Sequence, residues 1–174
     1  GQHQIWAAQF YPVARPRSFI TSGGLGTMGF GLGAALGAKI ANPSRPAVLF
    51  TGDGSFRMNC GELATLKTYG VPLLIVICNN GVLGMVRQWQ NLFYEGRYAE
   101  TTLDRPPNFV ALAEAYGLPG YRASGEDSFT AALDRALADI AGGRAALVEA
   151  LIDPDEKVLP MVPGGMPIDE QIMT

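Results

Sequence analysis

Histidine and cysteine, which build many metal centres and redox sites, are scarce in this sequence. The one histidine is His3, and the two cysteines, Cys60 and Cys78, stand at a separation that matches no metal-binding or redox motif. Both cysteines fall in segments that we expect in the core, which predicts buried free thiols and a reducing compartment such as the cytoplasm. A disulfide framework is therefore not expected.

Long hydrophobic runs and an excess of one charge are missing as well. The longest apolar run, residues 71–78, is far too short to span a bilayer, and no signal peptide is recognisable. The formal net charge is −3 and the basic residues are scattered, which argues against nucleic acid or an anionic membrane as a partner. With 174 residues and 48% hydrophobic content, the chain is predicted to form one compact α/β domain.

Polar loops follow two strand-like segments of the chain. Residues 46–51 (PAVLFT) and 71–78 (VPLLIVIC) are apolar and β-prone, so we expect two buried strands. A helix expected at 59–69 connects them in a β-α-β unit. Because the crossover of such a unit is right-handed, the carboxyl ends of both strands meet at one edge of a parallel sheet. Asp53, after the first strand, and Asn80, after the second, are then neighbours.

Asp53 and Asn80 supply the oxygen ligands that a hard divalent cation prefers. Magnesium is usually held by one or two protein groups together with phosphates and water. Gly52 and Gly54 let backbone N–H groups approach a phosphate closely. The pattern therefore predicts a site for a divalent cation that carries a diphosphate. The alternative is that residues 52–55 (GDGS) and 79–81 (NNG) form ordinary tight turns.

The glycine pattern at 24–29 (GLGTMG) supports a second alternative, a dinucleotide-binding fold. It matches G-x-G-x-x-G, follows an expected strand, opens an expected helix and has Asp53 downstream. We favour the metal interpretation because Asp53 is better explained by its own glycine-flanked loop and by Asn80. A dehydrogenase also needs a general acid or base at its hydride-accepting site, and the only histidine is His3.

The remaining segments alternate between strands and helices without repeats, which predicts a doubly wound parallel sheet flanked by helices. We expect a capping box at 59–62, strands at 18–21, 121–123 and 146–152, and helices at 28–40, from Asn108 as cap to Gly117, and from Asp127 or Ser128 as cap. The apolar face of the last helix is expected to comprise Phe129, Ala132, Leu133, Ala136, Leu137 and Ile140. We expect the domain to cover 1–153 and the tail, 154–174, to pack on the domain or on a partner.

The joint pattern resembles a known cofactor motif. Gly52-Asp53-Gly54-Ser55, followed downstream by Asn79-Asn80, is similar to the thiamin diphosphate motif of pyruvate decarboxylases, acetolactate synthases, benzoylformate decarboxylases and transketolases. Further stretches resemble the large, catalytic subunit of acetolactate synthases, at 1–9, 21–31, 83–90 and 158–163. The resemblance covers nearly the whole chain and implies the C-terminal, diphosphate-binding domain of a longer polypeptide. The start at Gly1, without an initiator methionine, agrees with a fragment.

The resemblance implies roles for residues at matching positions. The Mg²⁺ ligands would be Asp53, the Asn80 side chain and the backbone carbonyl of Val82. The cofactor would also contact Gln2, His3, Gly26, Met28, Gly52, Gly54, Ser55, Leu83, Gly84 and Met85. Among these, the Gly26 carbonyl would accept a hydrogen bond from the pyrimidine amino group, and Met28 would hold the folded shape of the cofactor.

The helix expected after Val82 would line a substrate channel. In the resembling family the residues that match Met85, Val86 and Trp89 face this channel, where herbicides also bind. From helical spacing alone, Met85 and Trp89 are instead expected to be core residues. Arg87 is expected to be solvated or to bridge domains. At Gly33 the family usually carries proline, a difference that should leave the metal site intact.

The implied reaction is decarboxylation of pyruvate and its condensation with a second 2-keto acid, pyruvate or 2-ketobutyrate, in branched-chain amino acid biosynthesis. In this family the activating glutamate comes from the pyrimidine-binding domain of a partner subunit, so we expect no catalytic residue here and no turnover by this chain alone. The implied partners are the N-terminal and middle domains, further copies in a homodimer or tetramer, and a small regulatory subunit if the enzyme is biosynthetic. FAD, where the enzyme holds it, would sit mainly on the middle domain.

Two further alternatives remain open. Glyoxylate carboligase and sulfoacetaldehyde acetyltransferase share the metal motif, so the acceptor is less well defined than the cofactor. The second alternative is that the chain is a non-catalytic assembly or regulatory module. Intact Asp53, Asn80 and Met28 argue against it, because a structural module has no need of a metal pair and a wedge together.

Overall fold

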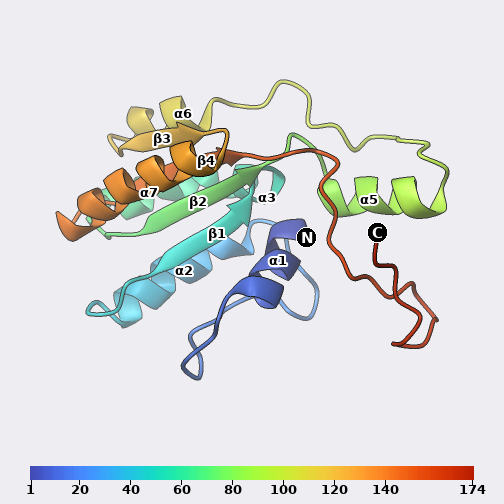
Figure 1. Cartoon of the computed structure of the whole chain (residues 1–174). Helices are drawn as coiled ribbons and strands as arrows, with labels where there is room; N and C mark the ends of the chain where they lie inside the picture. Colours follow the sequence, from blue (N-terminus) through green and yellow to red (C-terminus); the bar gives the residue numbers. More distant parts are fainter.

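A four-stranded parallel sheet forms the centre of the molecule (Figure 1). The computed structural model describes residues 1–174. The strands lie in the order β1-β2-β4-β3, with bounds β1 (Val48–Gly52), β2 (Leu74–Asn79), β3 (Gly120–Ala123) and β4 (Ala146–Leu151). The helices are α1 (Gln2–Phe10), α2 (Phe30–Ala41), α3 (Asp53–Arg57), the 3-10 helix η1 (Cys60–Glu62), α4 (Leu63–Thr68), α5 (Gly84–Phe93), α6 (Phe109–Ala115) and α7 (Glu126–Ala141). The expected parallel α/β fold is confirmed.

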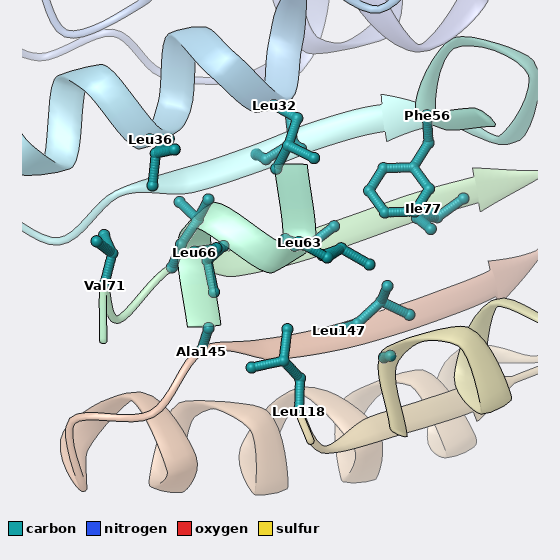
Figure 2. Close-up of a cluster of buried hydrophobic side chains, with 14 of the residues drawn as sticks. Leu32, Leu36, Phe56, Leu63, Leu66, Val71, Ile77, Leu118, Ala145 and Leu147 are labelled. Atoms are coloured by element: carbon teal, nitrogen blue, oxygen red, sulfur yellow. The ribbon is translucent and has the colours of Figure 1, made fainter. Parts of the chain in front are cut away.

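Helices cover both faces of this sheet, and each face has its own core. On one face, α2, α4 and α6 pack over Ile77 and its neighbours, with Leu63 and Phe109 fully buried (Figure 2). On the other face, α7 packs on β3 and β4 through Ala132 and Ala136. The two layers hold the strands rigidly, so the loops at their carboxyl ends start from fixed positions.

The expected β-α-β unit is present, although its connection is more broken than predicted. The chain passes from β1 through α3, η1 and α4 before it enters β2. The capping box at 59–62 is wrong, because the Asn59 side chain makes no capping bond and instead donates to the Gly29 carbonyl at 3.5 Å. Glu62 is likewise engaged elsewhere, since its carboxylate accepts from the Thr65 hydroxyl at 2.7 Å.

Strand β1 lies at the edge of the sheet and is buried on one face only. Leu49 and Thr51 are buried, whereas Val48 and Phe50 are 57% and 39% exposed. The prediction of a fully buried strand was therefore wrong for half of its side chains, because α7 covers β3 and β4 and does not extend over β1. The strand expected at 18–21 is also absent; the Gln4 amide donates to the hydroxyl of Thr21 at 2.6 Å in place of a ladder.

The later elements follow the prediction more closely. Asn108 caps α6 by accepting from the Ala111 N–H at 3.1 Å, and Gly117 stands just beyond its end with a φ of 69°. Helix α7 begins earlier than expected, after Gly125, and the Ser128 hydroxyl donates to the Gly125 carbonyl and does not cap the helix. Leu137, predicted on the apolar face of α7, is 48% exposed.

Both cysteines are free, as expected, but each is only partly buried. Cys60 lies in η1, where its thiol contacts the Arg57 carbonyl at 3.7 Å. Cys78 lies in β2, and burial, with the nearby Asp53, raises the pKa of its thiol to about 12. The Cys78 thiol is therefore protonated and unreactive near neutral pH.

The segment after Asp153 lies along α1 and α5 (Figure 1). The Gln88 side chain, on α5, donates to the Val158 carbonyl at 2.9 Å and accepts from the Val158 N–H at 2.8 Å. The Gln9 side chain, on α1, donates to the Leu159 carbonyl at 3.3 Å. None of the helices has the length and apolar character needed to cross a membrane.

Candidate cofactor-binding site

The carboxyl ends of β1 and β2 bring Asp53 and Asn80 to the same edge of the sheet. Gly52 pairs with Cys78 in the parallel ladder, so Asp53 and Asn80 each follow shortly after paired positions. Asp53 is the first residue of α3 and is only 2% exposed, and Asn80 lies in the turn between β2 and α5. This is the juxtaposition that the β-α-β pattern predicts.

Asp53 carries an unsatisfied polar atom at this edge. Its Oδ2 atom is buried and has no hydrogen-bond partner. Burial raises the pKa of the Asp53 carboxyl, while the backbone N–H groups of Gly54, Asp53 and Gly81 act in the opposite direction. A buried carboxylate oxygen without a partner is costly unless a cation or donor meets it. The residue therefore fits a metal ligand.

The turn at 79–82 offers two more oxygens beside this carboxylate. The Asn80 Oδ1 accepts one bond, from the Val82 N–H at 3.1 Å, and retains a second lone pair. Val82 pairs with Thr102 in an isolated antiparallel bridge. In this bridge the Leu103 N–H donates to the Gly81 carbonyl, and the Leu83 N–H donates to the Thr101 carbonyl. The Val82 carbonyl accepts no hydrogen bond from the backbone.

These acceptors suit one class of ion. No group of three or more His, Cys, Asp or Glu side chains gathers in the structure. One carboxylate, one amide oxygen and one main-chain carbonyl form an all-oxygen set, which suits Mg²⁺ or Ca²⁺ with phosphate or water completing the shell. The expected donor set therefore fits a magnesium–diphosphate group.

Helix α1 places Gln2 and His3 against the same edge. The Asn80 Nδ2 donates to the Gln2 Oε1 at 2.9 Å, and the Gln2 Nε2 donates to the Glu156 carbonyl at 2.8 Å. The imidazole of His3 lies over Gly52, where a Cβ would stand 3.0 Å from its Nδ1. Burial lowers the pKa of His3 to about 4. A neutral imidazole therefore faces this site at neutral pH.

The low pKa of His3 predicts a pH-dependent stability. As pH falls from 6.5 towards 4, the unfolded chain takes up a proton on this histidine and the native state does not. The free energy of unfolding should fall by up to about 1.4 kcal/mol per pH unit in that window. Denaturant unfolding of the wild type and of His3→Gln, at several pH values, measures the difference. Parallel pH dependences for the two proteins would contradict the prediction.

The glycine-rich loop before α2 meets α3 from the other side. The Ser55 hydroxyl accepts from the Gly29 N–H at 3.0 Å, so its own proton remains free to donate. Around Gly54, a Cβ would stand 3.4 Å from the Met28 methyl and 3.5 Å from a methyl of Leu83. Gly26 has a φ of 68°, which favours glycine and turns the backbone at this loop. No strand precedes the loop, so the dinucleotide alternative lacks its structural context.

Helix α5 exposes the residues expected at a substrate channel. Val86 and Trp89 are 50% and 45% exposed, and the Trp89 ring meets Phe93 edge-on at 5.4 Å. Met85 packs close to Gly1 at the start of α1. Trp89 is therefore not a core residue of this domain, contrary to the alternative from helical spacing.

Arg87 lies on the other side of α5 and is bound within the domain. Its guanidinium pairs with the Asp155 carboxylate at 2.7 Å and stacks over the Tyr98 ring at 3.9 Å. The expectation of a solvated arginine is thus corrected, because its partners come from the tail and from the loop after α5. A role in bridging domains stays a prediction.

Sequence reasoning missed several polar residues around the site. Gln88 is buried, and its side chain forms two hydrogen bonds with the Val158 backbone. No sequence pattern predicted this role. Glu149 is 1% exposed in β4 and accepts from the Asn79 amide at 2.7 Å. Its signal was visible: a lone acid inside the apolar run 146–152 (ALVEALI).

The chain matches a known protein family over most of its length. The family model for "Thiamine pyrophosphate enzyme, C-terminal TPP binding domain" matches residues 1–150. Over 172 residues the chain is 49% identical to the acetolactate synthase large subunit of Lactococcus lactis, covering 99% of this chain and 29% of that protein. It is also 49% identical over 172 residues to the acetolactate synthase isozyme 2 large subunit of Escherichia coli, covering 99% of this chain and 31% of that protein.

A solved structure gives the same result for the fold. The thiamine diphosphate-dependent 4-hydroxybenzoylformate decarboxylase of Rhodococcus jostii RHA1 is 34% identical with a TM-score of 0.66, covering 75% of this chain and 24% of that one. The chain spans less than a third of the length of these relatives. The resemblance found in the sequence is confirmed. The chain belongs to the thiamine pyrophosphate enzymes, as a member of their C-terminal TPP-binding domain family.

Proposed function

We propose that this chain forms the diphosphate-binding half of the active site of an acetolactate synthase. The observation that carries the proposal is the buried, unpartnered Oδ2 of Asp53, at the edge where Asn80 and Val82 offer further oxygens. Mg²⁺ held by these three groups would compensate the buried carboxylate and anchor the diphosphate. The identity to acetolactate synthase large subunits supports the choice of enzyme.

Thiamin diphosphate, when bound, supplies an electron sink for the carbanion formed in decarboxylation. The residues of this chain bind and orient it. The diphosphate would be held by the backbone at Gly52 and Gly54, the Ser55 hydroxyl and the neutral His3, while Gln2 accepts a hydrogen bond from the Asn80 amide. The Gly26 carbonyl would accept a hydrogen bond from the pyrimidine amino group, and Met28, which lies beside Leu83 and Gly54, would support the cofactor.

The start of α5 forms the wall of the substrate channel in this proposal. Gly84 and Met85 would contact the cofactor, and Val86 and Trp89 would contact the acceptor. The substrates are pyruvate and a second 2-keto acid, pyruvate or 2-ketobutyrate. The activating glutamate comes from a pyrimidine-binding domain outside this chain, so the chain alone turns over no substrate. Partner copies in a homodimer or tetramer supply that domain. If the enzyme is biosynthetic, a small regulatory subunit also binds. Any FAD is bound mainly by the middle domain.

A second candidate is another thiamin diphosphate decarboxylase or carboligase. The likeness to a 4-hydroxybenzoylformate decarboxylase, at 34% identity, favours this class as the runner-up. The two candidates differ in their product, since a decarboxylase releases an aldehyde and a synthase releases an acetohydroxy acid. Product analysis with pyruvate and the full-length protein separates them.

A calorimetric titration with thiamin diphosphate tests the proposed binding. The chain, and then the full-length protein, is titrated with Mg²⁺ present and again with the metal chelated. Heat that depends on the metal supports the site. Absence of heat in the full-length protein under both conditions would overturn it, whereas absence only in the isolated chain would show that the half-site needs its partner domain.

Replacing Trp89 should alter acceptor choice more than cofactor binding. Trp89 is 45% exposed on α5, so Trp89→Leu removes little core packing. In the full-length enzyme, we expect the ratio of kcat/KM for 2-ketobutyrate over pyruvate as acceptor to change by about tenfold or more. Competition assays measure the ratio, and calorimetry measures cofactor affinity. The reverse pattern, weaker cofactor binding with unchanged preference, would assign Trp89 to packing.

A further inference from the structure

A buried acid in the centre of β4 has no explanation in packing. Glu149 stands between Val148 and Ala150 in the strand, and its side chain is only 2% exposed. Taking a carboxylate out of water costs several kcal/mol, and an apolar residue of similar size would serve packing as well or better. The carboxylate must therefore be retained for the groups that it binds.

Each oxygen of Glu149 meets a donor from a neighbouring strand. Arg122 of β3, which pairs with Glu149 in the parallel register, donates from Nε to Oε2 at 2.8 Å. Asn79, the last residue of β2, donates from Nδ2 to Oε1 at 2.7 Å. Arg122 also donates to the Oδ1 of Asn108, the cap of α6, at 3.0 Å. The Glu149 carboxylate thus links β4 to both of its neighbours, β2 and β3, by hydrogen bonds.

Asn79 extends this chain of hydrogen bonds to the turn at 79–82. Because its amide nitrogen is held by Glu149, its Oδ1 points to the turn and accepts from the Gly81 N–H at 3.1 Å. Gly81 has a φ of 68°, a conformation that sets the direction of the residues on either side of it. Those residues are Asn80 and Val82, whose oxygens are the proposed metal ligands.

We propose that Glu149 is a positioning residue for the metal-binding turn, acting through Asn79 and the Gly81 N–H. The inference rests on the proposed function, since it assigns the turn to the metal. Glu149 touches neither metal nor cofactor. It orients the Asn79 amide, which holds the turn at Gly81 in one conformation before the ligand binds. The conformational entropy of Asn80 and Val82 is therefore lost during folding and not during binding.

Two single substitutions break this arrangement in different ways. In Glu149→Gln, the amide can accept on one side only, so either Arg122 or Asn79 faces another N–H. In Asn79→Asp, two carboxylates face each other without a donor between them. Each variant should weaken Mg²⁺-dependent thiamin diphosphate binding by the full-length protein by about 10–100-fold, the range measured for residues that orient metal ligands.

The double variant restores the pattern with donor and acceptor exchanged. In Asn79→Asp/Glu149→Gln, the amide introduced at position 149 would accept from Arg122 and donate to the new carboxylate at position 79. The other oxygen of that carboxylate accepts from Gly81 as before. Binding should recover to within about threefold of wild type. At positions 79 and 149 the wild type and the double variant each carry one negative charge, so net charge cannot explain a difference in binding between these two proteins.

Asp139 provides a matched control. It is equally an acid in the interior, 6% exposed, and bound to Tyr121 at 2.6 Å and to the Arg144 guanidinium, but it contacts no residue of the 79–82 turn. Asp139→Asn should lower the thermal midpoint and leave Mg²⁺-dependent binding unchanged. Glu149→Gln that behaved like this control, with lower stability but unchanged affinity, would overturn the inference, as would a double variant that failed to recover.

A readout without cofactor separates this inference from the proposed function. Hydrogen exchange at the Gly81 amide, measured in the metal-free full-length protein, should be at least about tenfold faster in Glu149→Gln than in wild type or Asp139→Asn. Faster exchange together with no Mg²⁺-dependent binding in the wild type would reject the proposed metal role and keep only the ordering of the turn. Unchanged exchange in Glu149→Gln would reject the route through Asn79.

Discussion

Asp53→Asn should abolish Mg²⁺-dependent binding of thiamin diphosphate without destabilising the metal-free protein. The carboxylate is buried, its Oδ2 has no partner, and burial raises its pKa, so the native state gains little from the charge in the absence of a cation. Removing the charge while keeping the shape takes away the one anionic ligand of the proposed site. We expect affinity to fall by at least about 100-fold, equivalent to about 2.7 kcal/mol.

Two measurements on the same variant separate an effect on binding from an effect on stability. Calorimetry gives the affinity with and without Mg²⁺, and thermal unfolding of the metal-free protein gives its stability. The expected combination is lost binding with an equal or higher thermal midpoint. Asp53→Ala should also lose binding, with some cost for the cavity that it leaves. Metal-dependent binding that persists in both variants would remove Asp53 from the metal site.

Gly84→Ala should disrupt the site through sterics and not through charge. A Cβ at Gly84 would collide with the Gln2 side chain and stand 2.8 Å from the Asn80 Nδ2. Gln2 is buried and bonded on both sides, to Asn80 and to the Glu156 carbonyl, so it cannot move without breaking those contacts. We expect a loss of stability of about 1–3 kcal/mol and Mg²⁺-dependent cofactor binding at least about tenfold weaker.

Another glycine and a compensating change serve as controls for Gly84→Ala. Gly33 lies in α2, and nothing stands within 4 Å of where its Cβ would be. Gly33→Ala should leave binding unchanged and stabilise the fold by about 0.5–1 kcal/mol, because alanine favours a helix interior. Gln2→Ala/Gly84→Ala creates room for the new methyl group and should be more stable than Gly84→Ala alone. A double variant no more stable than the single one would show that the collision is not the cause.

Local sequence patterns were sufficient to predict the site residues that directly follow each strand. The apolar runs at 46–51 and 71–78, followed by Gly-Asp-Gly and Asn-Asn-Gly, predicted parallel strands and the neighbouring positions of Asp53 and Asn80. A right-handed crossover leaves one arrangement for such a unit, so little tertiary information was needed. Asn108 and Gly117 were predicted for the same reason, since helix ends depend on hydrogen bonds and dihedral angles a few residues apart.

The failures in the fold occurred where a partner across the chain decided the outcome. Residues 18–21 have strand-like composition, yet Gln4 of α1 binds the Thr21 hydroxyl and no ladder forms. Val48 and Phe50 are apolar but exposed, because only tertiary structure shows how far α7 extends across the sheet. Strand propensity describes fitness for a half-buried surface and does not say which face is covered.

The sequence by itself determined the α/β class, the strand ends that carry Asp53 and Asn80, and the family of the cofactor, because these depend on motifs of contiguous residues. Only the tertiary structure decided which side chains support them. Gln2 accepts a hydrogen bond from Asn80 across 78 positions of the chain, and Glu149 accepts one from Asn79 across 70 positions. Such contacts leave almost no trace in local composition, since a buried polar group is stable only through partners that folding brings to it.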